Sequence, residues 1–232
     1  MHIPARFNGP PGSGNGGWCA GVFAVAAGAA PGGAARQVTL RLPPPLEAEL
    51  EVRTDPGYGG AGPALLASVY AGSDLIAEIA EAAEAGPGVD PVPWETAVAA
   101  ARDYPGLTDH PFPTCFVCGP ERAEGDGLRI FPGPLPDGRT AAPWTVPGEV
   151  SVPLLWAALD CPGGWTAIKR GQAYVLGRIT AAVEELPEPG ARCVVTGAVS
   201  ELAGRKALVD SAIHGSDGRR LAVARAVWIR IR

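Results

Sequence analysis

A glycine-rich turn at residues 13–24, SGNGGWCAGVFA, is the first segment whose residue types could do chemistry. Asn15 is its only amide, and Gly16 and Gly17 leave the backbone uncovered just before a small apolar run that is typical of a helix. The N–H groups at a helix N-terminus carry partial positive charge, so this turn could hold an anionic oxygen. A plain helix cap at Asn15 is the simpler interpretation, and either role needs a second group to drive a reaction.

A pair of cysteines is the second candidate. Cys115 and Cys118 have C-x2-C spacing, and His110 lies five residues before Cys115. A structural zinc site needs four ligands and usually two such pairs. The other cysteines are isolated in predicted helices or strands, at Cys19, Cys161 and Cys193. We therefore expect the cysteines to pack in the core without a metal, with a zinc site and a redox disulfide as the alternatives.

The bulk composition limits the class of protein. The 232 residues are 47 % hydrophobic and 19 % charged, which predicts a folded chain with a sizeable core. A net charge of −5 gives no basic surface for nucleic acid. No signal peptide and no uninterrupted apolar run long enough for a membrane span are evident. Five cysteines are an odd number, which favours a reduced, cytoplasmic location.

Secondary-structure signals divide the chain into two similar halves. The N-terminal half, residues 1–88, predicts a helix at about 17–29, and strands at 3–7, 36–42, 47–54, 64–71 and 73–82. A proline-rich linker at 89–114 contains a short helix at 94–104. The C-terminal half, residues 115–232, predicts a helix at 151–165 that kinks or stops near Pro162, and strands at 126–133, 139–146, 174–186, 191–202, 206–214 and 219–231.

One helix followed by an antiparallel meander, repeated once, resembles the hot-dog fold in its double form. Residues 115–130, CFVCGPERAEGDGLRI, are similar to the segment that opens many thioesterase-type hot-dog domains. The resemblance implies an α+β tandem hot-dog with two antiparallel sheets, each wrapping a central helix. It also implies hydrolysis of an acyl thioester such as an acyl-CoA, without a cofactor. The expected assembly is a monomeric pseudo-dimer or a homodimer that binds neither nucleic acid nor membrane.

The resemblance also suggests how one site is assembled. In that family a glycine turn supplies the N–H that binds the thioester carbonyl, and a carboxylate comes from the partner's helix. Nine residues after Asn15 the chain has Ala24, whereas nine residues after Ser151 it has Asp160. The first helix thus has the turn and the second has the acid. We expect Gly16 and Gly17 to polarise the carbonyl, and Asn15, which replaces the family's histidine, to orient the turn or the substrate.

Asp160 is then the group that attacks or activates water. Its apolar neighbours and its place near a helix end should raise its pKa towards neutrality, which suits a general base. A structural acid at the helix end is the plainer alternative. Three tryptophans near the two helices are candidates for lining the pocket, although core packing is the more common role of this residue type: Trp18, Trp156 and Trp165.

Two other functions compete with hydrolysis, and one other residue could act as the nucleophile. Loss of half of each symmetric site is also expected of a non-catalytic protein that binds an acyl group or another hydrophobic small molecule. A hydratase on the same fold would pair Asp160 with a histidine, and no such histidine is evident. Cys161, beside Asp160, is a further candidate nucleophile, again without a predictable histidine partner.

Overall fold

The computed structural model describes residues 1–54 and 64–231. Its helices are α1 (Gly16–Ala26), α2 (Trp94–Arg102) and α3 (Val152–Gly164), with short 3-10 turns at Ala5–Phe7 and Pro105–Leu107. The strands are β1 (Arg36–Leu40), β2 (Glu51–Thr54), β3 (Leu65–Ala71), β4 (Asp74–Glu81), β5 (Gly133–Pro134), β6 (Thr140–Thr145), β7 (Tyr174–Val183), β8 (Arg192–Ala203), β9 (Lys206–His214) and β10 (Arg220–Arg230). None of these helices is long and apolar enough to cross a membrane.

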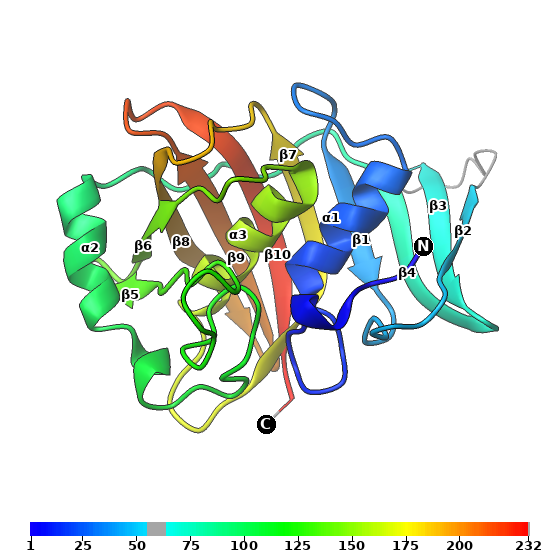
Figure 1. Ribbon diagram of the computed structural model, residues 1–232, viewed down its shortest axis with the longest axis horizontal. Coiled ribbons are helices and arrows are strands. Elements are labelled where there is room, and N and C mark those ends of the chain that lie inside the picture. The colour runs from blue at the N-terminus through cyan, green and yellow to red at the C-terminus, as the bar shows by residue number, and fades with distance from the viewer. Residues whose placement is uncertain (55–63, 232) are drawn as a thin grey trace.

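All these strands belong to one antiparallel sheet, in the order β2-β3-β4-β1-β7-β10-β9-β8-β6-β5 (Figure 1). The two halves join where β1 pairs with β7, with Val38 opposite Ile179. Outward from this seam, β1-β4-β3-β2 of the first half matches β7-β10-β9-β8 of the second. The halves therefore repeat one topology, but they share one continuous sheet where the sequence analysis expected two.

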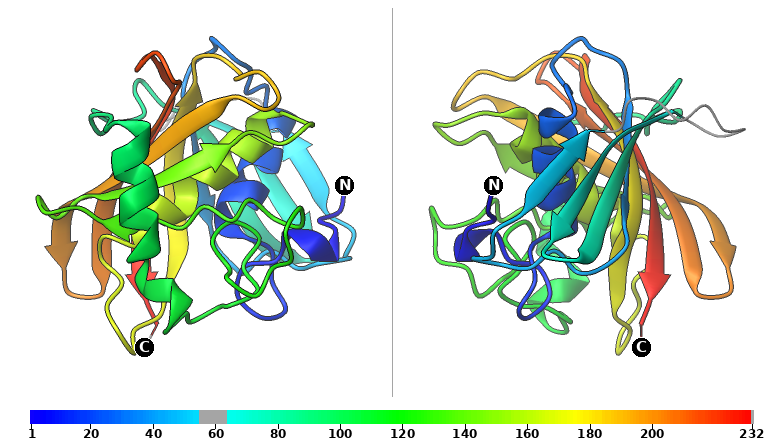
Figure 2. Two further views of the ribbon diagram at one scale, coloured as in Figure 1. Left: turned by 60° about the vertical axis from the view of Figure 1, so that its left-hand side comes forward. Right: turned by 90° about the vertical axis from the view of Figure 1, so that its right-hand side faces the viewer.

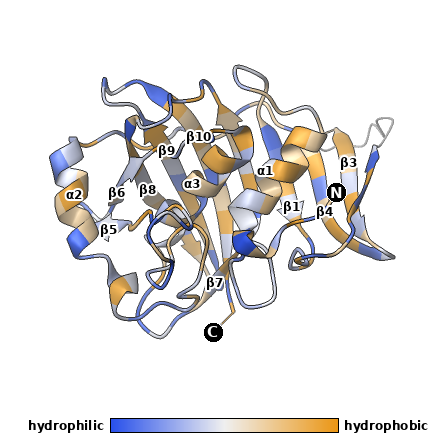
Figure 3. Cartoon of the chain, in the orientation of Figure 1, coloured by the Kyte–Doolittle hydropathy of each residue, from blue (hydrophilic) through white to orange (hydrophobic). Residues whose placement is uncertain are grey.

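Helices α1 and α3 form a layer on one face of this curved sheet (Figure 2). Both helices are coloured mainly as hydrophobic, whereas α2 is mixed (Figure 3). Helix α2 packs instead against Ala141 and Val194, whose neighbours Ala142 and Val195 belong to the core under α3. Because successive residues of a strand face opposite sides, α2 covers the other face of the sheet at its β6–β8 end.

The two central helices pack unusually closely, and glycines of α1 make this possible. A Cβ added to Gly17 would lie 2.5 Å from the Cβ of Asp160 and 2.7 Å from the carbonyl oxygen of Trp156. A Cβ added to Gly21 would lie 2.6 Å from the Cα of Pro153. Because Gly17 meets the end of α3 and Gly21 its beginning, the helices are antiparallel. The N-terminus of α1 thereby lies beside Asp160.

Most of the expected elements are confirmed, and two are wrong. The segment at 73–82 is the strand β4, as its hairpin position predicted. Residues 3–7, expected as a strand, form a 3-10 turn in which the Phe7 N–H bonds the Pro4 carbonyl. Residues 126–133, also expected as a strand, join the sheet only at Gly133, because Leu128 and Ile130 donate their N–H groups to the loop around Phe116.

The close contact at Gly17 predicts a loss of stability on adding one methyl group. Gly17→Ala should lower the free energy of unfolding by about 1–3 kcal/mol despite the better helix propensity of alanine, because α3 backbone atoms must move. Gly148→Ala is the matched control, since a Cβ there meets nothing within 4 Å. Urea unfolding of both variants measures the effect. Equal stabilities would contradict the packing described above.

Candidate active site

Asp160 of α3 contacts the N-terminus of α1. Its Oδ2 accepts a hydrogen bond from the Gly17 N–H at 2.9 Å and one from Asn15 Nδ2 at 3.3 Å. Asn15 also caps α1, because its Oδ1 accepts from the Trp18 N–H at 2.8 Å. The structure thus brings Asn15, Gly17 and Asp160 together, from helices in opposite halves of the chain.

The carboxylate of Asp160 is buried and only half satisfied. The residue is 2 % exposed, and burial is the main cause that raises its pKa to about 7. The hydrogen bonds from Gly17 and Asn15 act in the opposite direction and lower the pKa. In the part of the chain that the structure describes, Oδ1 has no hydrogen-bond partner. This oxygen is therefore the acceptor that remains available for water or a ligand.

The backbone N–H groups at the N-terminus of α1 have different hydrogen-bond partners from those expected from the sequence. The Gly17 N–H, expected to bind a substrate oxygen, donates to Asp160 instead. The absence of a side chain at Gly17 allows α3 to pack closely against α1. The Trp18 N–H is taken by Asn15. Gly16 donates no hydrogen bond within the described residues, and it lines a cavity. Gly16 is therefore the free donor at the positive end of the helix.

A cavity of about 460 Å³ lies in front of these groups, a size typical of small-molecule sites. Of the residues expected in the site, Asn15, Gly16, Asp160 and Trp165 line it. The remaining wall is mostly apolar and comes largely from the glycine turn, the segment after β1, and the ends of β7 and β10; examples are Pro44, Ile168, Leu176, Trp228 and Ile229. The arrangement offers one acid and one free backbone donor at an apolar pocket.

Two of the three tryptophans have a different position from the one expected. Trp18 stacks on Phe7 with ring centroids 3.7 Å apart, and Trp156 is 1 % exposed in the core. Neither is among the residues that line the cavity in the described chain. These two rings support the helices, whereas Trp165 alone of the three lies at the pocket wall.

The equivalent position in the other half of the described chain lacks two groups of this site, the backbone donor and the acid. Asn15 and Ser151 are the equivalent N-caps of α1 and α3. Pro153 therefore stands where α1 has Gly17, and proline has no N–H to donate. Ala24 stands where α3 has Asp160. The pseudo-symmetric position thus lacks the donor as well as the acid, which leaves one site of this kind in the described chain.

The cavity wall also contains three cysteines, one of which the sequence analysis treated as isolated. The sulfur atoms of Cys115, Cys118 and Cys161 all lie within 4.8 Å of one another. His110 also lines the cavity, with Nε2 3.3 Å from the Cys118 sulfur and Nδ1 accepting from the Phe112 N–H at 2.9 Å. The sequence showed His110 and the C-x2-C pair, but only the fold brings Cys161 to them.

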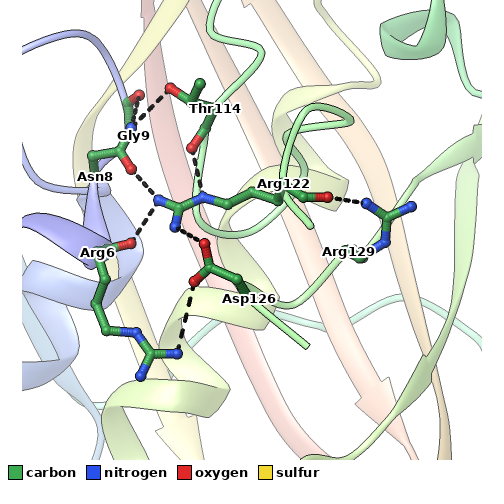
Figure 4. Close-up of polar contacts among 7 residues, drawn as sticks. All are labelled: Arg6, Asn8, Gly9, Thr114, Arg122, Asp126 and Arg129. Atoms are coloured by element: carbon green, nitrogen blue, oxygen red, sulfur yellow. Dashed lines mark hydrogen bonds and ion pairs between the residues drawn. The ribbon is translucent and has the colours of Figure 1, made fainter. Parts of the chain in front are cut away.

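The loop that carries Cys115 and Cys118 is fixed by a partly buried arginine, Arg122 (Figure 4). Arg122 donates to the Thr114 carbonyl at 2.8 Å and to the Arg6 carbonyl at 2.6 Å, and it pairs with Asp126 at 2.8 Å. Its guanidinium also bonds the side chain of Asn8. These contacts hold the loop against the N-terminal segment that leads into the glycine turn.

No protein-family model and no curated protein matches this sequence. Solved structures do match its fold. A TesB protein of Mycobacterium avium subspecies paratuberculosis aligns with a TM-score of 0.64 at 12 % identity, over 100 % of this chain and 91 % of that one. A candidate thioesterase of Novosphingobium aromaticivorans also aligns at 0.64, with 16 % identity over 99 % and 93 %.

A third match, from Alicyclobacillus acidocaldarius, is described as a conserved protein of unknown function with a hot-dog fold. It aligns with a TM-score of 0.59 at 11 % identity, over 100 % of this chain and 92 % of that one. The chain studied here therefore has the hot-dog fold, as its element order suggested. At these identities the likeness concerns the fold.

The contact between Asn15 and Asp160 predicts a charge-specific effect. Asn15→Asp keeps the capping oxygen but places a second carboxylate against Asp160, in a site where Asn15 is 3 % exposed. We expect the free energy of unfolding at pH 7 to fall by about 2 kcal/mol or more, because a buried charge is left uncompensated. Asn8→Asp is the control, since Arg122 already contacts Asn8 Oδ1. If thermal melting ranks the two variants alike, the Asn15–Asp160 contact is absent in solution.

Proposed function

We propose that this protein hydrolyses an acyl thioester, with an acyl-CoA as the model substrate, at one composite site. The observation that carries the proposal is the state of Asp160. One carboxylate oxygen is held by the N-terminus of α1, the other is buried without a partner among the described residues, and Asp160 itself lines an apolar cavity. A pKa near 7 suits a general base that works near neutrality. The description of the matching Novosphingobium aromaticivorans structure as a candidate thioesterase is consistent with this proposal.

The proposed reaction uses groups of this chain alone. Oδ1 of ionised Asp160 takes a proton from water as the water oxygen bonds to the thioester carbonyl carbon. The carbonyl oxygen gains the negative charge and accepts a hydrogen bond from the free N–H of Gly16. The tetrahedral intermediate then collapses, the carbon–sulfur bond breaks, and the leaving thiolate takes the proton back from Asp160. The products are a carboxylic acid and a free thiol.

We propose in addition that the chain is a double hot-dog, with repeats at 1–88 and 115–232 and a linker at 89–114. The matching strand orders on either side of the β1–β7 seam support this division. In this proposal the N-terminal repeat supplies the donors and the C-terminal repeat supplies the acid. A composite site across the seam makes the single chain sufficient for the chemistry.

Hydration chemistry is less well supported than hydrolysis. It would need a histidine beside Asp160, and His110 is the histidine of the cavity wall. Both of its ring nitrogens are engaged, one with the Phe112 N–H and the other with the Cys118 sulfur. An acid with one carboxylate oxygen still without a partner in the described residues, beside a free backbone donor, fits attack by water on a carbonyl more closely.

The test compares wild type with Asp160→Asn on a panel of short-chain, medium-chain and aromatic acyl-CoA thioesters. The amide keeps the shape and can still accept from Gly17, so the fold should be retained. Removal of the base should lower kcat by about two orders of magnitude or more. Asp103→Asn, at the exposed end of α2, is the matched control and should keep wild-type kcat. Release of free CoA is measured with a thiol reagent.

Two results would contradict the proposal. If Asp160→Asn keeps wild-type kcat, another group drives the reaction. If wild type is inactive on the whole panel yet its melting temperature rises with an acyl-CoA, the protein is a binding protein and Asp160 has a structural role.

A further inference from the structure

We infer that Cys115, Cys118 and Cys161 form a binding site for one thiophilic divalent metal ion of the Zn²⁺ type. Their sulfur atoms lie within 4.8 Å of one another. Tetrahedral zinc with bonds of about 2.3 Å holds its sulfur ligands about 3.8 Å apart, so small side-chain rotations suffice to close the site. Two ligands come from the C-x2-C loop and the third from α3, next to Asp160.

The loop has a backbone shaped around its sulfur atoms. The Gly119 N–H donates to the Cys115 carbonyl oxygen at 2.9 Å, which closes the C-x2-C segment into a tight turn. This tight turn needs glycine after the second cysteine, because a Cβ on Gly119 would lie 2.5 Å from the backbone nitrogen of Cys115 and 2.5 Å from the carbonyl oxygen of Pro113. Apolar packing of a cysteine requires no such arrangement. Outer hydrogen bonds to thiolate ligands are a usual feature of metal sites.

Side-chain donors converge on the same sulfur atoms. Asn15 Nδ2 lies 3.7 Å from the Cys115 sulfur, and His110 Nε2 lies 3.3 Å from the Cys118 sulfur. Because His110 Nδ1 accepts the Phe112 N–H, a neutral ring carries its proton on Nε2 and donates it to the sulfur. His110 is therefore a hydrogen-bond donor to the Cys118 sulfur.

The groups around the sulfur atoms also leave the position open to a cation. Asn15 Nδ2 contacts both the Cys115 sulfur and Oδ2 of Asp160, which places a carboxyl group beside the cluster. Within residues 1–54 and 64–231, no hydrogen bond or ion pair brings an arginine or lysine to these sulfurs. A divalent ion would bind the three sulfur atoms as thiolates, and each thiol would release its proton as the metal binds. Since all three cysteines line the cavity, the fourth metal position would be reached from the cavity by water.

The experiment measures bound metal in tag-free protein produced with added zinc and purified under reducing conditions. Elemental analysis should give about one zinc per chain, and replacement by Co²⁺ should give the near-ultraviolet charge-transfer absorption of cobalt–thiolate bonds. Cys118→Ala and Cys161→Ala should each lose the metal. Cys193→Ala is the matched control, because this buried cysteine is outside the cluster and should leave the stoichiometry unchanged. A strong chelator should lower the melting temperature of wild type but not that of Cys161→Ala.

A thiol titration keeps the inference testable if a variant does not fold. In the metal-bound wild type the three clustered thiols should be protected, and a chelator should expose them to the reagent. The inference is overturned if wild type takes up neither zinc nor cobalt while all five cysteines titrate as thiols after unfolding. It is equally overturned if two of the five are missing from that titration, since this result identifies a disulfide.

This inference does not depend on thioester hydrolysis. Asp160→Asn should keep its metal whatever happens to its activity, because the carboxylate is not one of the three ligands. A protein that binds zinc but hydrolyses no thioester would refute the proposed function alone. A protein that hydrolyses thioesters but takes up neither zinc nor cobalt would refute the metal site alone.

Discussion

The close antiparallel contact between α1 and α3 is the constraint on which the candidate site depends. Gly17 and Gly21 let the helix backbones approach, although glycine within a helix costs about 1 kcal/mol relative to alanine. The same approach brings a carboxylate to the Gly17 N–H, which gives a buried charge one of the partners that it needs. Helix packing and the position of the acid are therefore one feature. A wider spacing would separate Asp160 from Asn15 and open the cavity wall.

The parts of the fold that depend on local sequence could be predicted. Alternating strands, turn residues and the two helix starts are encoded within short windows, so the meander order and the equivalence of Asn15 and Ser151 were accessible. The resemblance to thioesterase-type hot-dog domains then related Asp160 to Asn15 without a structure. The structure brings these two residues into contact. The strands predicted at 3–7 and 126–133 are wrong because the backbone groups of these segments bond locally and to the cysteine loop, which strand propensity does not reveal.

What could not be predicted depends on contacts between distant segments. The merging of both halves into one sheet follows from the β1–β7 pairing, which leaves no sequence signature. Trp18 and Trp156 were indistinguishable from Trp165 by residue type, and only burial separates core from pocket. The meeting of Cys161 with the C-x2-C loop is of the same kind. The role of Gly17 also changed, because the sequence shows that a side chain is missing but not which neighbour requires it.

Pro153 and Ala24 affect how the sequences of the two central helices can vary by substitution. In a dimer of identical subunits each helix must carry both the donor and the acid, and every substitution acts on two sites at once. Here the donor-bearing and acid-bearing helices are separate stretches of one chain, so each can vary without altering its counterpart. Pro153 removes a backbone donor at the start of α3, and Ala24 gives α1 a small side chain where α3 has Asp160. A helix that had to carry both the donor and the acid could have neither residue at these positions. The backbone keeps its two-fold repeat, while the candidate site is present once in the part of the chain that the structure describes.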